Sequence, residues 1–248
     1  MLVELLSLYQ FLAGISLLVF TLCLSNSTLA KEQIQVVTEN WYPYNYLDEK
    51  QQVVGQSTTL VKQVLRAAEV DFTFDLYPWT RAMNLAKTTQ NVLIYTILQT
   101  PERQSMFHWI CPIAAKNLHQ LYRLSSRSDI DITSEQDIKN YSVAVTRDTF
   151  LHKLMLKLGL KEGQNLQVTG DDKINATLLL AGRVDILPEL QSSVYRQLVT
   201  QGLDKSYVTP LLSLSANHYP DYCMALSKPT PLELVEKIRA AHQKITDQ

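Results

Sequence analysis

Hydrophobic and polar residues follow two different periods along the chain after residue 32. Short stretches in which apolar and polar residues alternate, or in which all residues are apolar, predict strands. Stretches with apolar residues three and four positions apart predict helices. A first series predicts the strands 33–38, 71–79 and 91–98 and the helices 57–70 and 80–87. We expect Ser57 or Thr58 to cap the first of these helices. The continuous apolar character of 91–98 is typical of a buried strand in a parallel sheet.

A second series of the same kind begins near residue 141. It predicts the strands 141–146, 165–170 and 183–187 and the helices 149–160 and 171–182, which end near Gly159 and Gly182. A short helix starting within 134–137 precedes this series. An apolar strand, 222–227, and an amphipathic helix, 230–245, follow it. Alternating strands and helices favour an α/β architecture, and the break between the series predicts two α/β units rather than one continuous sheet.

The composition supports a folded, exported protein. Hydrophobic residues make up 46% of the chain and charged residues 19%, which argues against a disordered protein. Residues 1–30 form an apolar stretch with Thr28 and Ala30 placed for cleavage before Lys31, which we interpret as a secretory signal. Glu4 stands where a basic residue is usual, so an uncleaved membrane anchor and a misassigned start codon stay open as alternatives.

Charge and cysteine content limit the classes of partner. Without residues 1–30, 23 basic residues face 23 acidic ones, which gives no electrostatic reason to expect nucleic acid as a partner. Two cysteines, Cys111 and Cys223, remain in this part of the chain. A disulfide between them and two separate buried thiols are equally compatible with the sequence.

Four aromatic residues cluster directly after the first predicted strand. They are Trp41, Tyr42, Tyr44 and Tyr46. The carboxyl end of a strand in an α/β sheet usually faces the binding crevice, and aromatic rings there offer stacking area and polar handles. The sequence is compatible with a ligand wall and equally with a loop that packs its rings onto the protein.

Two arginines stand where a positive charge needs an explanation. Arg81 lies in the first turn of a predicted helix, where the helix dipole disfavours a cation, so we expect a carboxylate partner, either internal or on a ligand. Arg103 follows the apolar run 91–98 and a Thr-Pro-Glu turn. Its planar guanidinium with five donors suits a ligand carboxylate, and an ordinary surface arginine is the alternative.

Several of these stretches together resemble the family 3 bacterial extracellular solute-binding proteins, the amino-acid-binding type found in the periplasm. The resemblance rests on "VVTENWYPYNYLDE", "TILQTPERQ", "YSVAVTRDTFLHKLMLKLGL" and "LLLAGRVDILPE". It implies the two-lobed type II fold of periplasmic binding proteins, with a mixed sheet and flanking helices in each lobe and two crossover strands that allow hinge closure. Carried over, it predicts lobe one at 33–113 plus 218–248, lobe two at 118–213, and hinges near 114–117 and 214–217.

The resemblance also implies which residues of lobe one hold the ligand. The arginine of the Thr-x-x-Arg pattern, Arg103, would hold the ligand α-carboxylate with two donors, helped by Thr100 and by Thr96 earlier in the strand. Such a pair is strengthened in a closed cleft with little water. The chain departs from the family pattern at Leu98, where many relatives have a hydroxyl, and at Gln99, where a second arginine is frequent.

In lobe two the resemblance implies contacts from a strand-to-helix turn and from an acidic residue. The turn residues expected at the ligand are Thr146, Arg147 and Thr149. We expect the neighbouring Asp148 to cap the helix instead. The residue expected to take the ligand ammonium is Glu189, although a strict count from Asp185 gives Leu190.

No catalytic, cofactor or metal site is predicted. The five histidines show no paired metal-ligand spacing, and no phosphate-binding glycine loop or nucleophile elbow occurs. We therefore predict a periplasmic, monomeric solute-binding protein that captures an amino acid or related carboxylate for transport by an ABC permease. The alternatives are a protein that signals ligand capture to a membrane sensor and a dehydratase-like enzyme on the same scaffold.

Overall fold

The structure is a computed structural model and describes residues 33–247. The predicted signal segment 1–30 lies outside the described residues. The strands are β1 Gln33–Thr38, β2 Tyr46–Leu47, β3 Val53–Val54, β4 Asp71–Leu76, β5 Val92–Leu98, β6 Phe107–Ala114, β7 Gln120–Leu124, β8 Val143–Thr146, β9 Leu166–Thr169, β10 Leu187–Glu189, β11 Val208–Ser213 and β12 Tyr222–Ser227. The α-helices are α2 Gln56–Ala67, α3 Trp79–Thr88, α4 Phe150–Lys157, α5 Asp172–Leu180, α6 Gln191–Thr200 and α7 Leu232–Thr246. Short 3₁₀ helices are η1 Pro101–Met106, η2 Glu135–Asn140, η3 Lys205–Tyr207 and η4 Ala216–His218.

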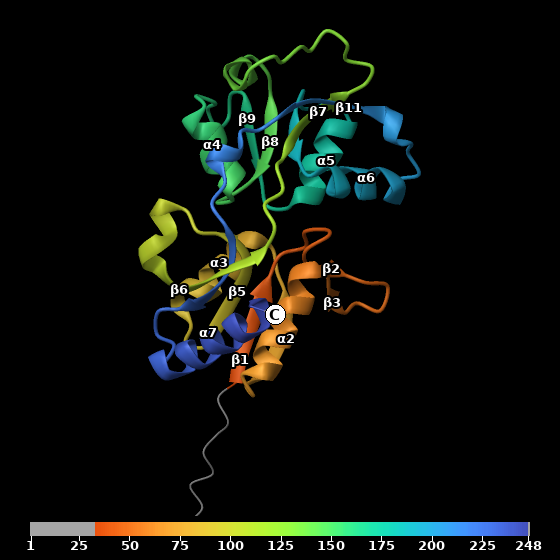
Figure 1. Cartoon of the computed structure of the whole chain (residues 1–248). Helices are drawn as coiled ribbons and strands as arrows, with labels where there is room; N and C mark the ends of the chain where they lie inside the picture. The colour runs from red at the N-terminus through yellow and green to blue at the C-terminus, as the bar shows by residue number, and fades with distance from the viewer. Residues whose placement is uncertain (1–32, 248) are drawn as a thin grey trace, which may run out of the picture. The chain divides into compact units, whose positions relative to one another are not determined.

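Five strands form the larger sheet, in the order β4-β1-β5-β12-β6. β1 pairs parallel with β4 and β5, and β12 pairs antiparallel with β5 and β6, so the sheet is mixed. Successive residues of a strand face opposite sides: Val36 packs in the core shared with α2 and α7, and Val37 packs in the core shared with α3. Figure 1 shows α2 and α7 next to each other along this sheet.

The short strands β2 and β3 pair antiparallel with each other beside α2 and β4 of the first unit, and β7 to β11 belong to the second α/β unit. β7 pairs antiparallel with both β10 and β11, and β8 pairs parallel with β9. A single parallel bridge from Val143 to Ile186 connects β8 to the chain just before β10. Helices α5 and α6 contact each other, and their apolar residues share a core with β7, β8, β10 and β11.

The predicted fold class is confirmed, with two α/β units built from separate sheets. The predicted strand 33–38 matches β1 residue for residue. The predicted strand 183–187 is wrong, because only Ile186 bridges to β8 and the strand β10 starts at Leu187. The strands β6, β7 and β11 were not predicted.

The predicted cap of helix α2 is also wrong. Gly55 is the N-cap, with φ 129°, and a Cβ atom there would lie 2.2 Å from the carbonyl oxygen of Tyr44. Thr58 is buried and its Oγ1 shares a hydrogen bond of 2.7 Å with the Tyr95 hydroxyl. A threonine that bonds into the core is not available to the end of its own helix.

Two chain segments connect the sheets, and they bond to each other. The Leu214 N–H donates to the His119 carbonyl oxygen at 2.9 Å, and Lys116 forms an ion pair with Asp221 at 3.2 Å. The limits of the two lobes and of their hinges remain predictions. No helix among residues 33–247 has the length and apolar character to cross a membrane.

Cys111 and Cys223 form a disulfide, the point that the sequence left open. Their Cα atoms lie 4.5 Å apart, and the bond closes a loop with a sequence separation of 112. The two cysteines belong to the neighbouring strands β6 and β12 of the larger sheet. The disulfide therefore joins the returning strand of the chain to the first part of the same sheet.

Candidate functional site

A cavity of about 60 Å³, here called the inner cavity, is lined by residues of both α/β units. The walls include Arg103, Thr96, Glu39, Asp172 and Glu189. The volume is several times the ~10–15 Å³ that one water needs and well below the ~300 Å³ at which pockets for drug-sized ligands begin. The space therefore suits a few polar atoms, such as the charged head of a small molecule.

Arg103 is the buried cation of the inner cavity. Arg103 is 7% exposed. Its guanidinium donates to the carbonyl oxygens of Asp148 at 2.9 Å and Leu98 at 3.4 Å. The guanidinium also lies 5.2 Å from the ring centre of Trp79. Burial lowers the pKa of Arg103 to about 10, so the side chain stays charged at neutral pH. Within residues 33–247 no carboxylate forms an ion pair with it, and its charge is available to an anion.

Thr96 presents a hydroxyl beside Arg103 that has no partner. Strand β12 pairs Cys223 with Ile97 and Met224 with Tyr95, so Thr96 is the extra residue of a β-bulge. Its φ of 57° is uncommon for a β-branched residue. The residue is 5% exposed, and within the described chain its Oγ1 has no hydrogen-bond partner. Backbone strain and an unpaired buried hydroxyl at a cavity wall are typical of a binding site.

The turn after β8 supplies the opposite wall. Thr146 Oγ1 donates to Asp172 Oδ1 and accepts from Asn175 Nδ2 at 2.9 Å. Thr149 is the N-cap of α4 and its Oγ1 accepts from the His152 N–H at 3.2 Å, so the expectation that Asp148 caps this helix is wrong. Asp148 has a φ of 58° and turns its carbonyl oxygen towards Arg103.

Three carboxylates face the cavity with Arg103. They are Glu39 directly after β1, Asp172 at the start of α5, and Glu189 at the end of β10. Glu189 is buried, and its Oε1 accepts from the indole N–H of Trp41 at 3.3 Å and from the Leu190 N–H at 2.7 Å. Leu190 itself is fully buried in the core, so the acidic side chain in the cavity is Glu189.

The pKa values of these carboxyl groups are raised. Burial, and then the charge of Asp172, raise the pKa of Glu189 to about 8. Burial and the neighbouring Asp171 raise the pKa of Asp172 to about 6. Burial, and then the charges of Asp172 and Glu189, raise the pKa of Glu39 well above its usual value. Three acids that resist ionisation together form a site where a cationic group would be stabilised.

Trp41 belongs to an aromatic stack that continues towards the connecting segments. Its ring is parallel to His119, with centres 5.8 Å apart, and His119 stacks in turn on Tyr219 at 5.5 Å. Burial lowers the pKa of His119 to about 3, and its Nδ1 lies 2.9 Å from the Tyr219 hydroxyl. The imidazole is therefore neutral, and it fixes the Trp41 ring that closes one side of the cavity.

A second set of contacts crosses between the two α/β units outside the inner cavity. Ser193 on α6 donates to the Tyr42 carbonyl oxygen at 2.7 Å. One turn later, the guanidinium of Arg196 lies 4.6 Å from the ring centre of Tyr42 and 4.5 Å from that of Tyr46. Helix α6 therefore contacts the loop that carries the aromatic cluster through both a hydrogen bond and cation–π contacts.

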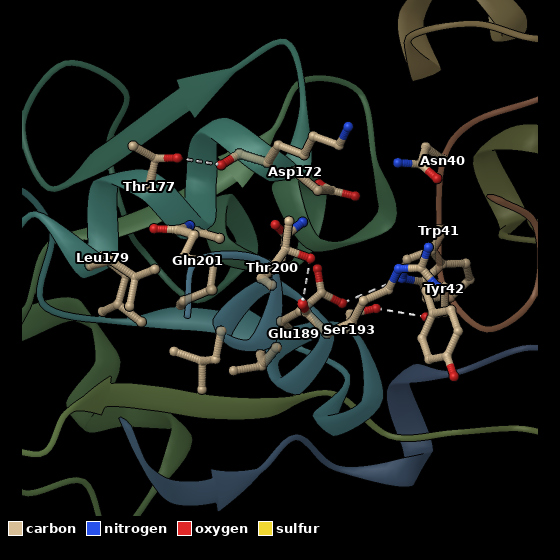
Figure 2. A pocket seen from close by; sticks show the side chains of 18 of the residues that line it. Asn40, Trp41, Tyr42, Asp172, Thr177, Leu179, Glu189, Ser193, Thr200 and Gln201 are labelled. Carbon is tan, nitrogen blue, oxygen red and sulfur yellow. Dashed lines mark hydrogen bonds between the residues drawn. The ribbon is translucent and has the colours of Figure 1, made fainter. Parts of the chain in front are cut away.

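A larger cavity of about 460 Å³, here called the outer cavity, is lined by the loop with Trp41 and Tyr42 and by residues of α5 and α6. Figure 2 shows Trp41 and Tyr42 towards one side of it, Leu179 towards the other, and Glu189 between them. Trp41, Asp172 and Glu189 line both cavities. These three residues therefore form a wall that the two cavities share.

The structure brings together most, but not all, of the residues expected at the ligand. Arg103, Thr96, Trp41, Thr146, Thr149 and Glu189 line the inner cavity, and Tyr42 lines the outer one. Tyr44 packs its ring against Trp41 and Tyr222 in the core. Thr100 accepts a backbone hydrogen bond from Arg103 as the N-cap of η1.

The two other arginines point elsewhere. Arg81 is exposed and lies 4.1 Å from the ring centre of Tyr77. Arg147 has a side chain that is 51% exposed and lies 3.6 Å from Glu162. Neither is among the residues that line the inner cavity.

Sequence reasoning gave no role at the ligand to several residues that line the inner cavity. Glu39, Asp172, Asn175, His119 and Trp79 belong to this group. A usable signal existed for two of them, because Glu39 follows β1 directly and Asp172 follows β9 within a few residues, and the carboxyl ends of strands face the crevice. No local pattern marked His119. Among the described residues, no group of three or more histidine, cysteine or acidic side chains is arranged to hold a metal ion.

Solved structures with the same fold are binding proteins and a sensor domain. A histidine kinase sensor domain with similarity to periplasmic binding proteins is 17% identical, with a TM-score of 0.74, covering 88% of this chain and 92% of that chain. An ancestral arginine-binding protein bound to arginine is 18% identical, with a TM-score of 0.71 and coverage of 87% and 93%. The arginine-, lysine-, histidine-binding protein ArtJ from Geobacillus stearothermophilus is 17% identical, with a TM-score of 0.72 and coverage of 87% and 90%. The predicted periplasmic-binding-protein fold is thereby confirmed.

Sequence comparison assigns the family. No curated protein matches the chain. The model of the bacterial extracellular solute-binding proteins, family 3, matches residues 34–248. The family and the fold are those of binding proteins rather than enzymes. Since the match includes both α/β units and the inner cavity between them, the chain belongs to the family 3 bacterial extracellular solute-binding proteins.

Proposed function

We propose that this protein is exported to the periplasm and closes its two lobes on one α-amino acid. The observation that carries the proposal is the pairing, in one small cavity, of a buried guanidinium with a set of carboxylates. An α-amino acid is the simplest molecule that offers an anion and a cation at matching distance. Two of the similar proteins named above bind arginine, or arginine, lysine and histidine, which agrees with a ligand of this class.

The ligand carboxylate binds to Arg103. A planar guanidinium matches the two oxygens of a carboxylate, and the bond is strong in a site that excludes water. The unpaired Oγ1 of Thr96 supplies a further donor at the same wall. Leu98, which lines the same cavity, has no polar group in its side chain, so Thr96 supplies the side-chain hydroxyl on this strand.

The ligand ammonium binds to Asp172 and Glu189. At neutral pH the raised pKa values keep a proton on Glu189 and leave Asp172 mostly ionised, so the ionised Asp172 offsets the charge of Arg103. A zwitterion adds no net charge to such a site, and its ammonium favours the ionised form of the acids.

A thermal-shift screen against the twenty amino acids and their amine and acid analogues tests the proposal. Ligands that bind only the folded state raise its stability by mass action. We expect stabilisation by at least one α-amino acid and by neither of its analogues. A folded protein that no amino acid stabilises contradicts the proposal.

Amino-acid affinity will rise with pH between about 6 and 8, the range set by Asp172 and Glu189. A bound ammonium favours the ionised carboxylates and lowers their pKa values, so binding releases protons and is weaker where the acids are protonated. Calorimetry at pH 5.5 to 8, in buffers of different ionisation enthalpy, measures both the affinity and the protons released. Glu189→Gln removes one titrating group and reduces the proton release, whereas pH-independent affinity in the wild type would show that these acids do not meet the ligand.

Replacing Arg196 with alanine will weaken amino-acid binding about two- to fivefold without touching the inner cavity. The guanidinium lies over Tyr42 and Tyr46 only when α6 and the aromatic loop meet, and an exposed cation–π contact is worth about 0.5–1 kcal/mol. Stopped-flow measurement of the association and dissociation rates should show that the loss of affinity comes from faster ligand dissociation. Arg183→Ala, an exposed arginine of the same α/β unit, is the matched control. Equal effects of the two variants would rule out a closing role for Arg196.

Signalling to a membrane receptor is the second candidate for the downstream role, because a histidine kinase sensor domain shares this fold over 88% of the chain. Delivery to an ABC permease is the first, and a monomer serves either role. Both roles use the closed lobes as the signal. A permease and an ATPase encoded beside this chain would favour transport, and an adjacent sensor kinase would favour signalling.

A further inference from the structure

We propose that His152 is a positioning residue for closure, because it holds the turn at Asp148 through which the two α/β units bond to each other. His152 does not line the inner cavity, so it acts on the ligand site through this turn. The inference goes beyond the proposed function, since the turn holds the units together whatever ligand lies between them. One of its two tests, the rate of ligand dissociation, rests on the proposed function.

The carbonyl oxygen of Asp148 joins the two units. It accepts from the indole N–H of Trp79 and from the guanidinium of Arg103, each at 2.9 Å. Trp79 begins α3 and Arg103 lies in η1, so both donors belong to the first unit, whereas Asp148 follows β8 of the second. A carbonyl oxygen has two lone pairs, and these two donors use both of them. The direction of one backbone carbonyl therefore decides how the guanidinium of Arg103 is held beside the inner cavity.

The backbone at Asp148 needs support from outside the residue. Its φ of 58° lies in the left-handed region, which is unfavourable for residues other than glycine. Its own carboxylate is directed to solvent, with a side chain that is 54% exposed and lies 4.0 Å from Lys153 Nζ. The support comes instead from His152, a residue that is 2% exposed.

His152 and its neighbours hold the peptide groups on both sides of Asp148. The Asp148 N–H donates to Nδ1 of His152 at 3.1 Å, which fixes the preceding peptide group. The Thr149 N–H, in the same peptide group as the Asp148 carbonyl, donates to the Thr146 carbonyl oxygen at 3.4 Å. The His152 N–H in turn donates to Thr149 Oγ1 at 3.2 Å. With both peptide groups bonded, the Asp148 carbonyl is directed towards the first unit.

Glu162 sets the tautomer of His152. Because Nδ1 accepts from a backbone N–H, the ring proton is on Nε2, which donates to Glu162 Oε1 at 2.9 Å. Glu162 also forms an ion pair with Arg147 at 3.6 Å. Arg147, expected at the ligand from the sequence, therefore supports the turn from the surface. The two ring nitrogens have different partners, so shorter and longer amide side chains can separate their roles.

NMR spectra of the protein with ¹⁵N-labelled tryptophan, recorded with and without L-norleucine, test the inference. We expect the Trp79 indole N–H, identified by its loss in Trp79→Phe, to exchange slowly with solvent in the wild type. His152→Asn places an amide oxygen near the position of Nδ1 and should keep this protection. His152→Gln places its amide near the position of Nε2 and loses the acceptor for Asp148. It should speed the exchange at least about threefold, the effect of one hydrogen bond.

Two controls separate a positioning role from a general loss of structure. Trp109 donates to the Gln104 carbonyl oxygen at 3.0 Å within the first unit, so its exchange should be the same in the wild type and in both variants. His152→Leu removes both side-chain hydrogen bonds and covers the case in which His152→Gln fails to fold.

Stopped-flow measurement of L-norleucine binding tests the consequence for the ligand. His152→Gln should speed dissociation about three- to tenfold and leave association within about twofold, because the turn bonds to the first unit only in the closed form. His152→Asn should keep the dissociation rate close to that of the wild type. His108→Gln, at a histidine of β6 that does not line the inner cavity, is the matched control and should change neither rate.

The outcomes separate this inference from the proposed function. Equal Trp79 exchange in the wild type, His152→Asn and His152→Gln overturns the inference, as does rapid exchange in the wild type. A change at Trp79 and Trp109 together shows a general loss of structure and also overturns it. A wild type that keeps the expected Trp79 pattern but binds no amino acid in the thermal-shift screen contradicts the proposed function alone.

Discussion

Replacing Arg103 with alanine will weaken amino-acid binding by a factor of about 30 to several thousand. Removing one partner of a buried, hydrogen-bonded charge pair costs about 2–5 kcal/mol, much of it because the remaining charge is left unpaired. Arg103 is 7% exposed, and its own hydrogen bonds go to backbone carbonyl oxygens, so no other side chain takes over its charge. Isothermal titration calorimetry of the purified variant measures the loss.

Arg81→Ala is the matched control for this experiment. Arg81 is exposed over Tyr77 and does not line the inner cavity, so its removal should leave affinity within about twofold. Thermal unfolding without ligand checks that Arg103→Ala is folded. Unchanged affinity in a folded Arg103→Ala variant would show that the ligand carboxylate does not bind there.

Removing the disulfide will lower the free energy of unfolding by about 2–4 kcal/mol. A cross-link restricts the unfolded chain more strongly the longer the loop that it closes, and this one has a sequence separation of 112. The double variant Cys111→Ala/Cys223→Ala leaves no free thiol behind. Urea unfolding followed by circular dichroism, at equal protein concentration, measures the difference.

Reductant provides the control for the disulfide. Dithiothreitol should destabilise the wild type towards the level of the double variant and leave the double variant unchanged. Neither cysteine lines the inner cavity, so amino-acid affinity of the folded double variant should stay close to that of the wild type. Wild type that is equally stable with and without reductant would contradict a stabilising disulfide.

Most strands of the larger sheet, and the helices that pack on it, could be predicted from the sequence, because their apolar residues recur at the regular spacing of a strand or a helix. The strand 33–38 and the buried run 91–98 carry their burial pattern in the sequence itself. The short strand β10 was misplaced, because pairing with β7 decides where it starts and the local pattern does not. The predicted cap of α2 was wrong for a similar reason, because Thr58 forms a hydrogen bond with Tyr95, 37 residues away.

In the candidate site, too, some residues could be predicted from the sequence and others could not. Family resemblance pointed to Arg103 and Glu189, and both line the inner cavity. The acidic cluster was not predicted, because Glu39, Asp172 and Glu189 come from separate segments, and Asp172 and Glu189 raise the pKa of Glu39 only after folding. The free hydroxyl of Thr96 depends on a β-bulge opposite β12, which no sequence period signals.

In the proposed complex, one small cavity holds a carboxylate on Arg103 and an ammonium on the acidic cluster. Titration of the wild type with L-norleucine, hexanoate and pentylamine tests it most directly, because hexanoate lacks the ammonium and pentylamine lacks the carboxylate. We expect norleucine to bind and each analogue to bind at least about 30-fold more weakly, the lower bound for a lost buried charge pair. Hexanoate or pentylamine binding as tightly as norleucine would contradict it.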